Sequence, residues 1–194
     1  MKYLSFDIEA TGLEPNDYII EFACVPFCST SKTIRHELSF HHYLKCPSFA
    51  SLKPTLNPWV IEHNQELIEK AHQQGLSIDN FKSQLANYLE SKKVKDFFDN
   101  ESITLFGKSM AAIDLPFLHR DLGWDFMRTY FVHRQLDLSS VSYALIDMGV
   151  IPAECQSGSY LMKYLNMGDV CHTALEDAVN TVKMYFSLIE KVKK

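Results

Sequence analysis

Residues 2–13 read KYLSFDIEATGL, and this stretch sets the expected start of the fold. Residues 2–9 alternate in polarity, which predicts a β-strand whose successive side chains project to opposite faces. The apolar side chains of this strand share one face, and Asp7 and Glu9 share the other. The Thr-Gly pair that follows is typical of a turn and ends the strand. The sequence therefore opens on a strand that carries two carboxylates on one face.

The rest of the chain predicts strands first and alternating helices and strands later. Two further strand-like runs, 18–27 and 33–43, complete an antiparallel meander. The proline-containing region 44–75 predicts a loop that leads into a short helix. Four elements follow: a helix capped by Ser77, a strand at 103–106, a helix over about 110–122, and a last helix opened by a capping box of Thr173 and Glu176. This order predicts a single α/β domain over 1–194 with a mixed sheet flanked by helices.

The composition is that of an ordinary globular protein, with 46% hydrophobic and 22% charged residues. No apolar run approaches the roughly 18 residues that a membrane span needs, so we expect no membrane association. The early acidic residues Asp7 and Glu9 argue against a signal peptide, and the five cysteines lack close paired spacing. We therefore expect reduced thiols and a cytoplasmic protein. The net charge of −5 argues against binding long duplexes by phosphate neutralisation, although not against handling a phosphate through a bound metal.

Asp7 and Glu9 are the first candidate metal ligands. Two carboxylates on one strand face repel each other unless a cation neutralises them. Hard divalent ions such as Mg²⁺ and Mn²⁺ prefer oxygen ligands of this kind. The D-x-E pattern is also common on solvated strands, so by itself it leaves both interpretations open.

Two further segments carry candidate functional side chains. In FGKSMAAIDLPFL (106–118), Asp114 is flanked by apolar residues that would turn its helix face inward, where a carboxylate needs a partner. In HTALEDA (172–178), His172 precedes the last helix and Asp177 lies in its second turn. That arrangement suits a general base beside a metal ligand. The alternatives are a surface aspartate and a surface histidine on ordinary amphipathic helices.

Taken together, three segments resemble the DEDDh family of 3′-to-5′ exonucleases, which has a ribonuclease H-like fold. They are FDIEATGL (6–13), GKSMAAIDLPFL (107–118) and HTALEDA (172–178), which stand in family order and at family-like separations. One such motif is weak, but three in order are hard to obtain by chance. The resemblance extends over nearly the whole chain.

The resemblance implies a role for each of five side chains. Asp7, Glu9, Asp114 and Asp177 correspond to the four carboxylates that bind two divalent metal ions, Mg²⁺ or Mn²⁺. His172 corresponds to the general base. The implied reaction is hydrolysis of a phosphodiester bond by a two-metal mechanism.

The same resemblance implies four substrate-binding residues: Thr11, Gly12, Leu13 and Ser109. Leu13 matches the position at which family members pack against the terminal base, and backbone groups near Glu9 to Thr11 would hold the terminal ribose. Lys108-Ser109 stands where many relatives have His-Asn or Asn-Ser. Lys108 either reaches a substrate phosphate or faces solvent.

The branch of the family is not decided by the sequence. HRQLDLSSV (133–141) resembles oligoribonucleases, whereas SYLMKYLNM (159–167) is more similar to the proofreading-subunit branch. The expected partners are the 3′ ends of short or single-stranded nucleic acid, either RNA or DNA, and the oligoribonuclease branch implies a homodimer. The alternatives are a catalytically silent nucleic-acid-binding relative and a phosphodiesterase that acts on small nucleotides.

Overall fold

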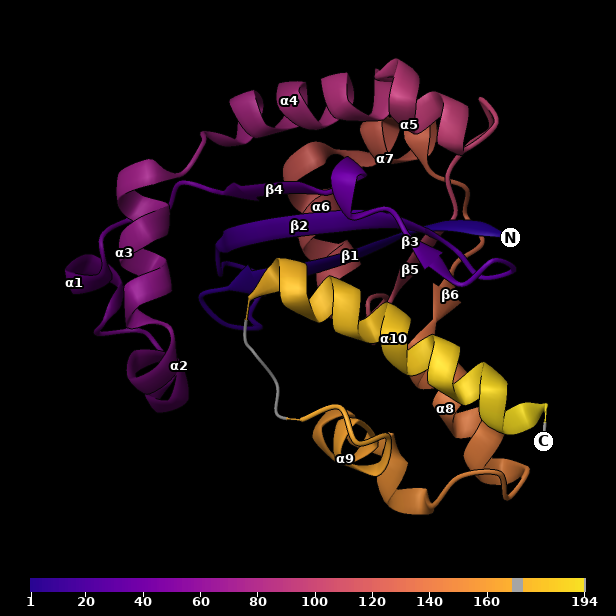
Figure 1. The fold of residues 1–194 in the computed structure, drawn as a ribbon. Coiled ribbons are helices and arrows are strands. Elements are labelled where there is room, and N and C mark those ends of the chain that lie inside the picture. The colour runs from indigo at the N-terminus through magenta and orange to yellow at the C-terminus, as the bar shows by residue number, and fades with distance from the viewer. Residues whose placement is uncertain (169–172, 194) are drawn as a thin grey trace.

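The computed structural model describes residues 1–168 and 173–193. Within these residues, six strands form one mixed sheet with helices on both faces (Figure 1). The strand order is β3-β2-β1-β5-β6, and β4 also pairs with β2. β1 pairs antiparallel with β2 and parallel with β5, so it lies inside the sheet. The strands are β1 (Lys2–Ala10), β2 (Ile19–Cys28), β3 (Thr33–Ile34), β4 (Phe40–Tyr43), β5 (Leu105–Gly107) and β6 (Leu136–Asp137).

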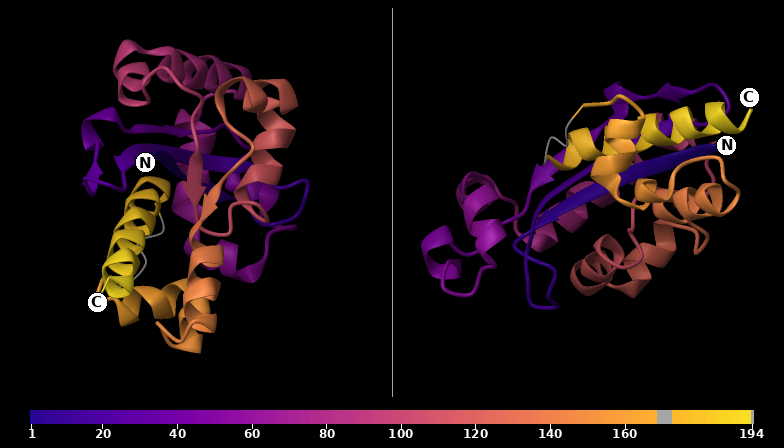
Figure 2. Two further views of the ribbon diagram at one scale, coloured as in Figure 1. Left: turned by 90° about the vertical axis from the view of Figure 1, so that its right-hand side faces the viewer. Right: turned by 90° about the horizontal axis from the view of Figure 1, so that it is seen from below.

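The helices cover the two faces and one end of the sheet. They are η1 (His36–Leu38), α1 (Phe49–Leu52), α2 (Pro58–His63), α3 (Gln65–Gln74), α4 (Ile78–Glu90), α5 (Lys92–Phe97), α6 (Asp114–Leu122), α7 (Trp124–Tyr130), α8 (Leu138–Asp147), η2 (Ala153–Gln156), α9 (Gly158–Tyr164) and α10 (Ala174–Val192). α10 runs along the strands, and α1–α3 gather beyond the end of the sheet near the start of α10 (Figures 1 and 2). No helix within the described parts of the chain is long and apolar enough to cross a membrane.

The alternation of β1 divides its residues between two layers. Leu4, Phe6 and Ile8 belong to a buried cluster that also contains residues of α4 and α6. On the other face, the Ser5 hydroxyl donates a hydrogen bond to the carbonyl of Ala178 in α10, at 2.8 Å. Because side chains alternate along a strand, Asp7 and Glu9 lie on the same face as Ser5 and are directed toward α10.

The fold class expected from the sequence is confirmed, with local corrections in the strands and helices. The region 44–75, expected to be a loop that leads into one short helix, instead contains the three helices α1, α2 and α3. The single strand expected over 33–43 is wrong, because β3 and β4 are separated by η1 and pair with different parts of β2. The gap between them lies opposite Val25 and Pro26, and proline has no N–H to donate to a ladder. The helix expected from about residue 110 begins only at Asp114, because the residues before it form a turn.

The last helix begins where the sequence indicates, at Ala174 after the N-cap Thr173. The expected capping box is wrong in its hydrogen bonds. The Thr173 hydroxyl donates to Oε2 of Glu176 at 2.9 Å instead of accepting from a backbone N–H. The negative charge of Glu176 still lies in the first turn, where the helix dipole favours it.

Candidate active site

Three half-buried carboxylates meet near the end of β1. Asp7 and Glu9 come from the strand, and Asp177 comes from α10. Asp177 lies in the first turn of this helix, so the expectation that it lies in the second turn is wrong. One carboxylate oxygen from each lies within 4.8 Å of the other two. The bond between Ser5 and α10 keeps the helix against the strand at this point. Oxygen ligands this close together form a donor set suited to a hard divalent cation.

Asp114 approaches the same group from the start of α6. Its side chain is 5% exposed, and its Oδ1 accepts the backbone N–H of Ile8 at 3.2 Å. It is outside the group of three, yet it is close enough that its negative charge raises the pKa of Asp7. The structure therefore brings all four carboxylates expected from the sequence to one region.

Burial is the largest cause that raises the pKa values of Asp7, Glu9 and Asp114, and repulsion from neighbouring carboxylates is the next cause at Asp7 and Glu9. Burial raises the pKa of Asp7 well above its usual range, and the charges of Asp114, Glu9 and Asp177 raise it further. Burial, Asp177 and Glu21 raise the pKa of Glu9 to about 7. Burial likewise raises the pKa of Asp114 to about 7. Without a cation, these groups hold protons at a pH where isolated carboxylic acids are ionised.

Two cavities flank the carboxylates. One, of about 310 Å³, is lined by residues that include Asp7, Asp114 and Asp177. The other, of about 700 Å³, is lined by residues that include Glu9 and Leu13. Both cavities are also lined by Ile8 and Ile113, so the carboxylates lie where the two meet. An extended ligand that occupied both cavities would have one of its bonds beside the carboxylates.

Lys108 lines the smaller cavity together with the carboxylates. Its positive charge lowers the pKa of Asp114 and so opposes the effect of burial there. Its side chain crosses Gly158 so closely that a Cβ at position 158 would lie 2.6 Å from the Lys108 Cε. The sequence left two alternatives for Lys108, contact with a substrate phosphate or exposure to solvent. The structure favours the first, because the side chain is directed into the smaller cavity.

The loop between β1 and β2 holds three of the expected substrate-binding residues. The Thr11 N–H donates to the carbonyl of Tyr18, and its hydroxyl donates to Oδ1 of Asp17, both at 2.9 Å. A side chain at Gly12 would collide with the Asp17 carboxylate. Leu13 is 73% exposed and lines the larger cavity. Thr11 and Gly12 therefore shape the loop, while Leu13 is free to contact a ligand.

Ser109, the fourth expected substrate-binding residue, belongs to the turn before α6. Its φ is 56°, and its hydroxyl is hydrogen-bonded to Oγ of Ser139 at 2.8 Å. The backbone N–H groups of Ser109 and Met110 donate to the two carboxylate oxygens of Asp137, at 3.1 and 3.0 Å. Among the described residues, Ser109 is not part of the lining of either cavity beside the carboxylates. Asp137 therefore fixes the turn that carries Lys108 and leads to Asp114.

Glu21 is a site residue that the sequence analysis did not identify. It is 2% exposed, and its Oε1 lies 2.6 Å from Nε2 of His41. Its Oε2 accepts the backbone N–H of Ala174 at 3.2 Å. Glu21 also faces Glu9 across the β1–β2 ladder. The available signal was a carboxylate inside the apolar run YIIEFACVPF, since a buried carboxylate needs a partner.

His172, the expected general base, lies outside the described residues. The neighbouring Thr173 is described and forms the N-cap of α10. The structure therefore places the four expected carboxylates and the four expected substrate-binding residues, and the role of His172 continues to rest on its motif.

The chain belongs to the RNase_T exonuclease family, whose model matches residues 4–185. This match confirms the family that the three sequence motifs indicate. No curated protein matches the chain by sequence.

Solved nuclease structures share the fold at low sequence identity. Cell-death related nuclease 4 has a TM-score of 0.67 at 17% identity over 97% of this chain, which spans 64% of that protein. The nuclease domain of 3′hExo, a DEDDh family member solved with rAMP, has a TM-score of 0.67 at 15% identity over 97% of this chain and 92% of its own. Pop2p of S. pombe, in its Mg²⁺- and Mn²⁺-bound form, has a TM-score of 0.65 at 14% identity over 96% of this chain and 82% of its own.

Proposed function

We propose that this protein is a metal-dependent 3′-to-5′ exonuclease that acts on short or single-stranded nucleic acid and releases nucleoside 5′-monophosphates. The observation that carries the proposal is the meeting of Asp7, Glu9 and Asp177, with oxygens within 4.8 Å of one another, in a member of an exonuclease family. Carboxylates that repel one another next to two cavities are costly unless they bind a cation. The close approach of these carboxylates is therefore better explained by a role in binding a cation than by a role in stabilising the fold.

The donor set fits a hard divalent cation. Its ligand atoms are carboxylate oxygens, and the pKa values of Asp7, Glu9 and Asp114 are raised when no cation is bound. We assign Asp7, Glu9, Asp114 and Asp177 as the residues that hold two such ions, Mg²⁺ or Mn²⁺. When bound, the ions supply Lewis acidity toward the scissile phosphate and lower the pKa of the attacking water.

The side chains of the chain itself would bind and orient the substrate. Leu13 projects into the larger cavity and offers an apolar surface to the terminal base. Lys108 enters the smaller cavity, where its ammonium group could contact the phosphate next to the carboxylates. We assign His172 as the group that takes the proton from the attacking water, an assignment supported by its place in the third motif.

The direct test is product analysis with oligonucleotides of RNA and DNA, labelled at the 3′ or the 5′ end and graded in length. In Mg²⁺ or Mn²⁺ we expect a 3′ label to be released at once as a mononucleotide, while a 5′ label moves to progressively shorter fragments. Release of a 5′ label first would contradict the assigned polarity.

The same assay separates the alternatives. Binding of oligonucleotides without turnover in either metal would indicate a silent nucleic-acid-binding relative. Turnover confined to dinucleotides would indicate a phosphodiesterase of small nucleotides. The Asp7→Asn variant serves as the control for a contaminating nuclease.

A further inference from the structure

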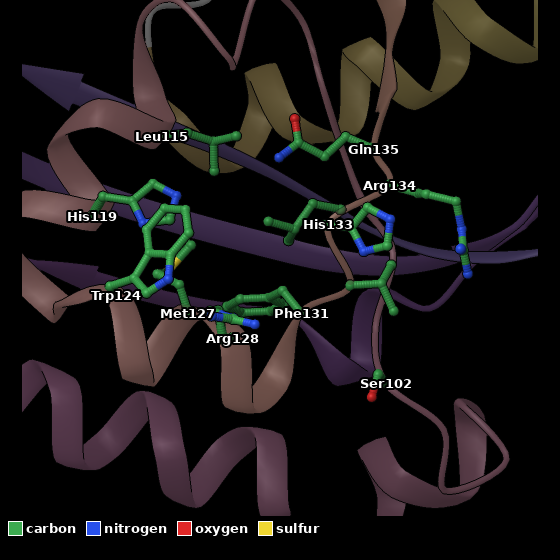
Figure 3. A pocket seen from close by; sticks show the side chains of 12 residues that line it. Ser102, Leu115, His119, Trp124, Met127, Arg128, Phe131, His133, Arg134 and Gln135 are labelled. Carbon is green, nitrogen blue, oxygen red and sulfur yellow. The ribbon is translucent and has the colours of Figure 1, made fainter.

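A third cavity, of about 660 Å³, lies between α6, α7 and the segment that leads into β6 (Figure 3). We name it the α6–α7 pocket. Its lining includes His119, Trp124, Arg128, Phe131, His133 and Arg134. Among the described residues, it shares no lining residue with the two cavities beside the carboxylates. It is therefore a separate feature of the surface.

The pocket has an aromatic platform at one side. The rings of Trp124 and His119 are stacked, with centroids 4.6 Å apart and planes inclined by 30° (Figure 3). Trp124 is 59% exposed, so much of its indole ring remains open to a ligand. Exposed indole rings of this kind stack on nucleobases, which all have a flat π face.

His119 also carries an unsatisfied polar atom. Its Nδ1 is buried, and within the described residues it has no hydrogen-bond partner. A buried polar atom without a partner costs free energy, so such an atom beside an open cavity calls for an explanation. Because this atom is covered, His119 contributes its stacked ring to the pocket and not a hydrogen bond to a ligand.

The charge of the pocket is positive and uncompensated. Two of the four arginines of the chain, Arg128 and Arg134, line it, and both are exposed. Neither forms an ion pair within the parts of the chain that the structure describes, and no carboxylate is among the lining residues there. In a chain of net charge −5, this concentration of free guanidinium groups favours an anionic ligand. Guanidinium groups match phosphate in geometry.

We propose that the α6–α7 pocket binds a nucleotide unit, with the base stacked on Trp124, the phosphate held by Arg128, and Arg134 adding positive charge at the far side of the pocket (Figure 3). Apolar lining side chains such as Met127 and Phe131 would form the floor beneath the base. This ligand accounts for the platform and for the positive charge together. An apolar ligand would leave the arginines unused, and an inorganic anion would leave the indole unused.

α6 connects this pocket to the carboxylates. Asp114 is the first residue of the helix, and His119 follows five residues later, about 7.5 Å further along the axis at 1.5 Å per residue. A single strand bound at the carboxylates and running along α6 would therefore reach the pocket within a few nucleotides. The nucleotide unit comes either from this strand, which rests on the proposed function, or from a free nucleoside monophosphate, which does not.

The two tryptophans of the chain allow a direct test. Trp59 lines the cavity that contains Glu9, and Trp124 lines the α6–α7 pocket. The Trp59→Phe variant therefore carries a single tryptophan, in the pocket. Titration of this variant with 5′-AMP and with a series of single-stranded oligonucleotides, in EDTA, should quench its fluorescence saturably. The chelator keeps cations from the carboxylates and so separates the two sites.

Two variants and two controls identify the residues responsible, with binding of a labelled oligonucleotide as the readout. Trp124→Ala should weaken binding about 5- to 150-fold, the range for loss of one base–aromatic stack. Arg128→Ala should lower the salt slope of binding by about 0.7, the contribution of one phosphate contact on a single strand. Tyr143→Ala and Arg35→Ala remove an exposed aromatic ring and an exposed arginine outside the pocket, and neither should change binding.

Each outcome has one meaning. Saturable quenching by 5′-AMP assigns the pocket to a free nucleotide, and quenching by oligonucleotides alone assigns it to the strand. Absence of quenching by both ligands overturns the proposal, even if the protein hydrolyses oligonucleotides in Mg²⁺ or Mn²⁺. Quenching in a protein that shows no hydrolysis supports the pocket and removes the proposed nuclease function.

Discussion

The backbone N–H of Ala174, at the start of α10, donates its hydrogen bond to Glu21, the residue that faces Glu9 across the central ladder. One buried carboxylate thus connects the strand that carries Glu9 with the helix that carries Asp177. The second oxygen of Glu21 is held by His41 on β4, which fixes the direction of the carboxylate. Glu21 therefore positions the strand and the helix that carry these carboxylates without being part of the group of three.

Replacement of Glu21 should affect metal binding more than overall folding. In Glu21→Ala, the Ala174 N–H loses its acceptor and the start of α10 is released from β2. We expect the affinity for Mn²⁺ to fall about 10- to 100-fold, as for other residues that orient metal ligands. Calorimetric titration measures this, and Glu21→Gln should retain much of the affinity because its amide oxygen can still accept from Ala174. Equal losses in both variants would contradict a positioning role, and Glu154→Ala, which removes an exposed glutamate, is the control.

Asp7→Asn should abolish turnover and leave the fold intact. Burial and the neighbouring carboxylates raise the pKa of Asp7, so this carboxyl group destabilises the folded protein when no cation is bound, and the neutral amide of asparagine removes that cost. We therefore expect a melting temperature in EDTA at least as high as that of the wild type. Hydrolysis near the wild-type rate in Mg²⁺ would disprove the assignment of the site.

The stability of the metal-free protein should fall as the pH rises from about 4 to about 7. The pKa of Glu9 is raised from 4.5 to about 7 and that of Asp114 from 3.8 to about 7. The folded state therefore binds protons more tightly than the unfolded chain, and this stabilisation is lost as the groups ionise. Urea unfolding in EDTA across this range measures the effect.

Added Mg²⁺ or Mn²⁺ should restore stability at neutral pH, because an ion that binds only the folded state favours it by mass action. The gain should be smallest near pH 4, where protons compete for the same oxygens. A stability that rises between pH 4 and pH 7 in EDTA, or a gain from metal that is independent of pH, would contradict the raised pKa values of Glu9 and Asp114.

Lys108→Met should weaken substrate binding more than it lowers kcat. The substitution keeps an apolar stem against Gly158 and removes the charge from the smaller cavity. We expect KM to rise and the salt slope of oligonucleotide binding to fall by about 0.7, as for one lost phosphate contact. Lys93→Met, which removes an exposed lysine of α5, should leave both unchanged. An unaltered salt slope in Lys108→Met would mean that this lysine does not contact phosphate.

His172→Ala tests the assigned base. We expect kcat to fall by about 10²- to 10⁴-fold with little change in substrate binding, since general-base catalysis contributes about this factor. The acidic limb of the pH–rate profile should disappear with it. A loss confined to KM would make His172 a binding residue.

The sequence predicted those parts of the site that depend on local periodicity. The common face of Asp7 and Glu9 follows from the two-residue repeat of a strand, which no distant contact alters. The start of α6 could not be predicted in this way, because the turn before it is held by hydrogen bonds to Asp137. This residue accepts the N–H groups of Ser109 and Met110, which are 28 and 27 residues away in the sequence. The bond between Glu21 and Ala174 spans 153 residues and has no local signature beyond a carboxylate in an apolar run.

The nine residues of β1 are subject to two different constraints, packing in the interior on one face and the candidate site on the other. Its even-numbered positions Leu4, Phe6 and Ile8 are packed in the interior, whereas Asp7 and Glu9 serve the site on the opposite face. Exhaustive mutagenesis over residues 6–9 of this strand should therefore give a phenotype that alternates with every residue. Variants at the even positions should be scarce in the cell but active per folded molecule, and variants at Asp7 and Glu9 should be abundant but inert. Such a strand can lose its chemistry in evolution while its fold persists.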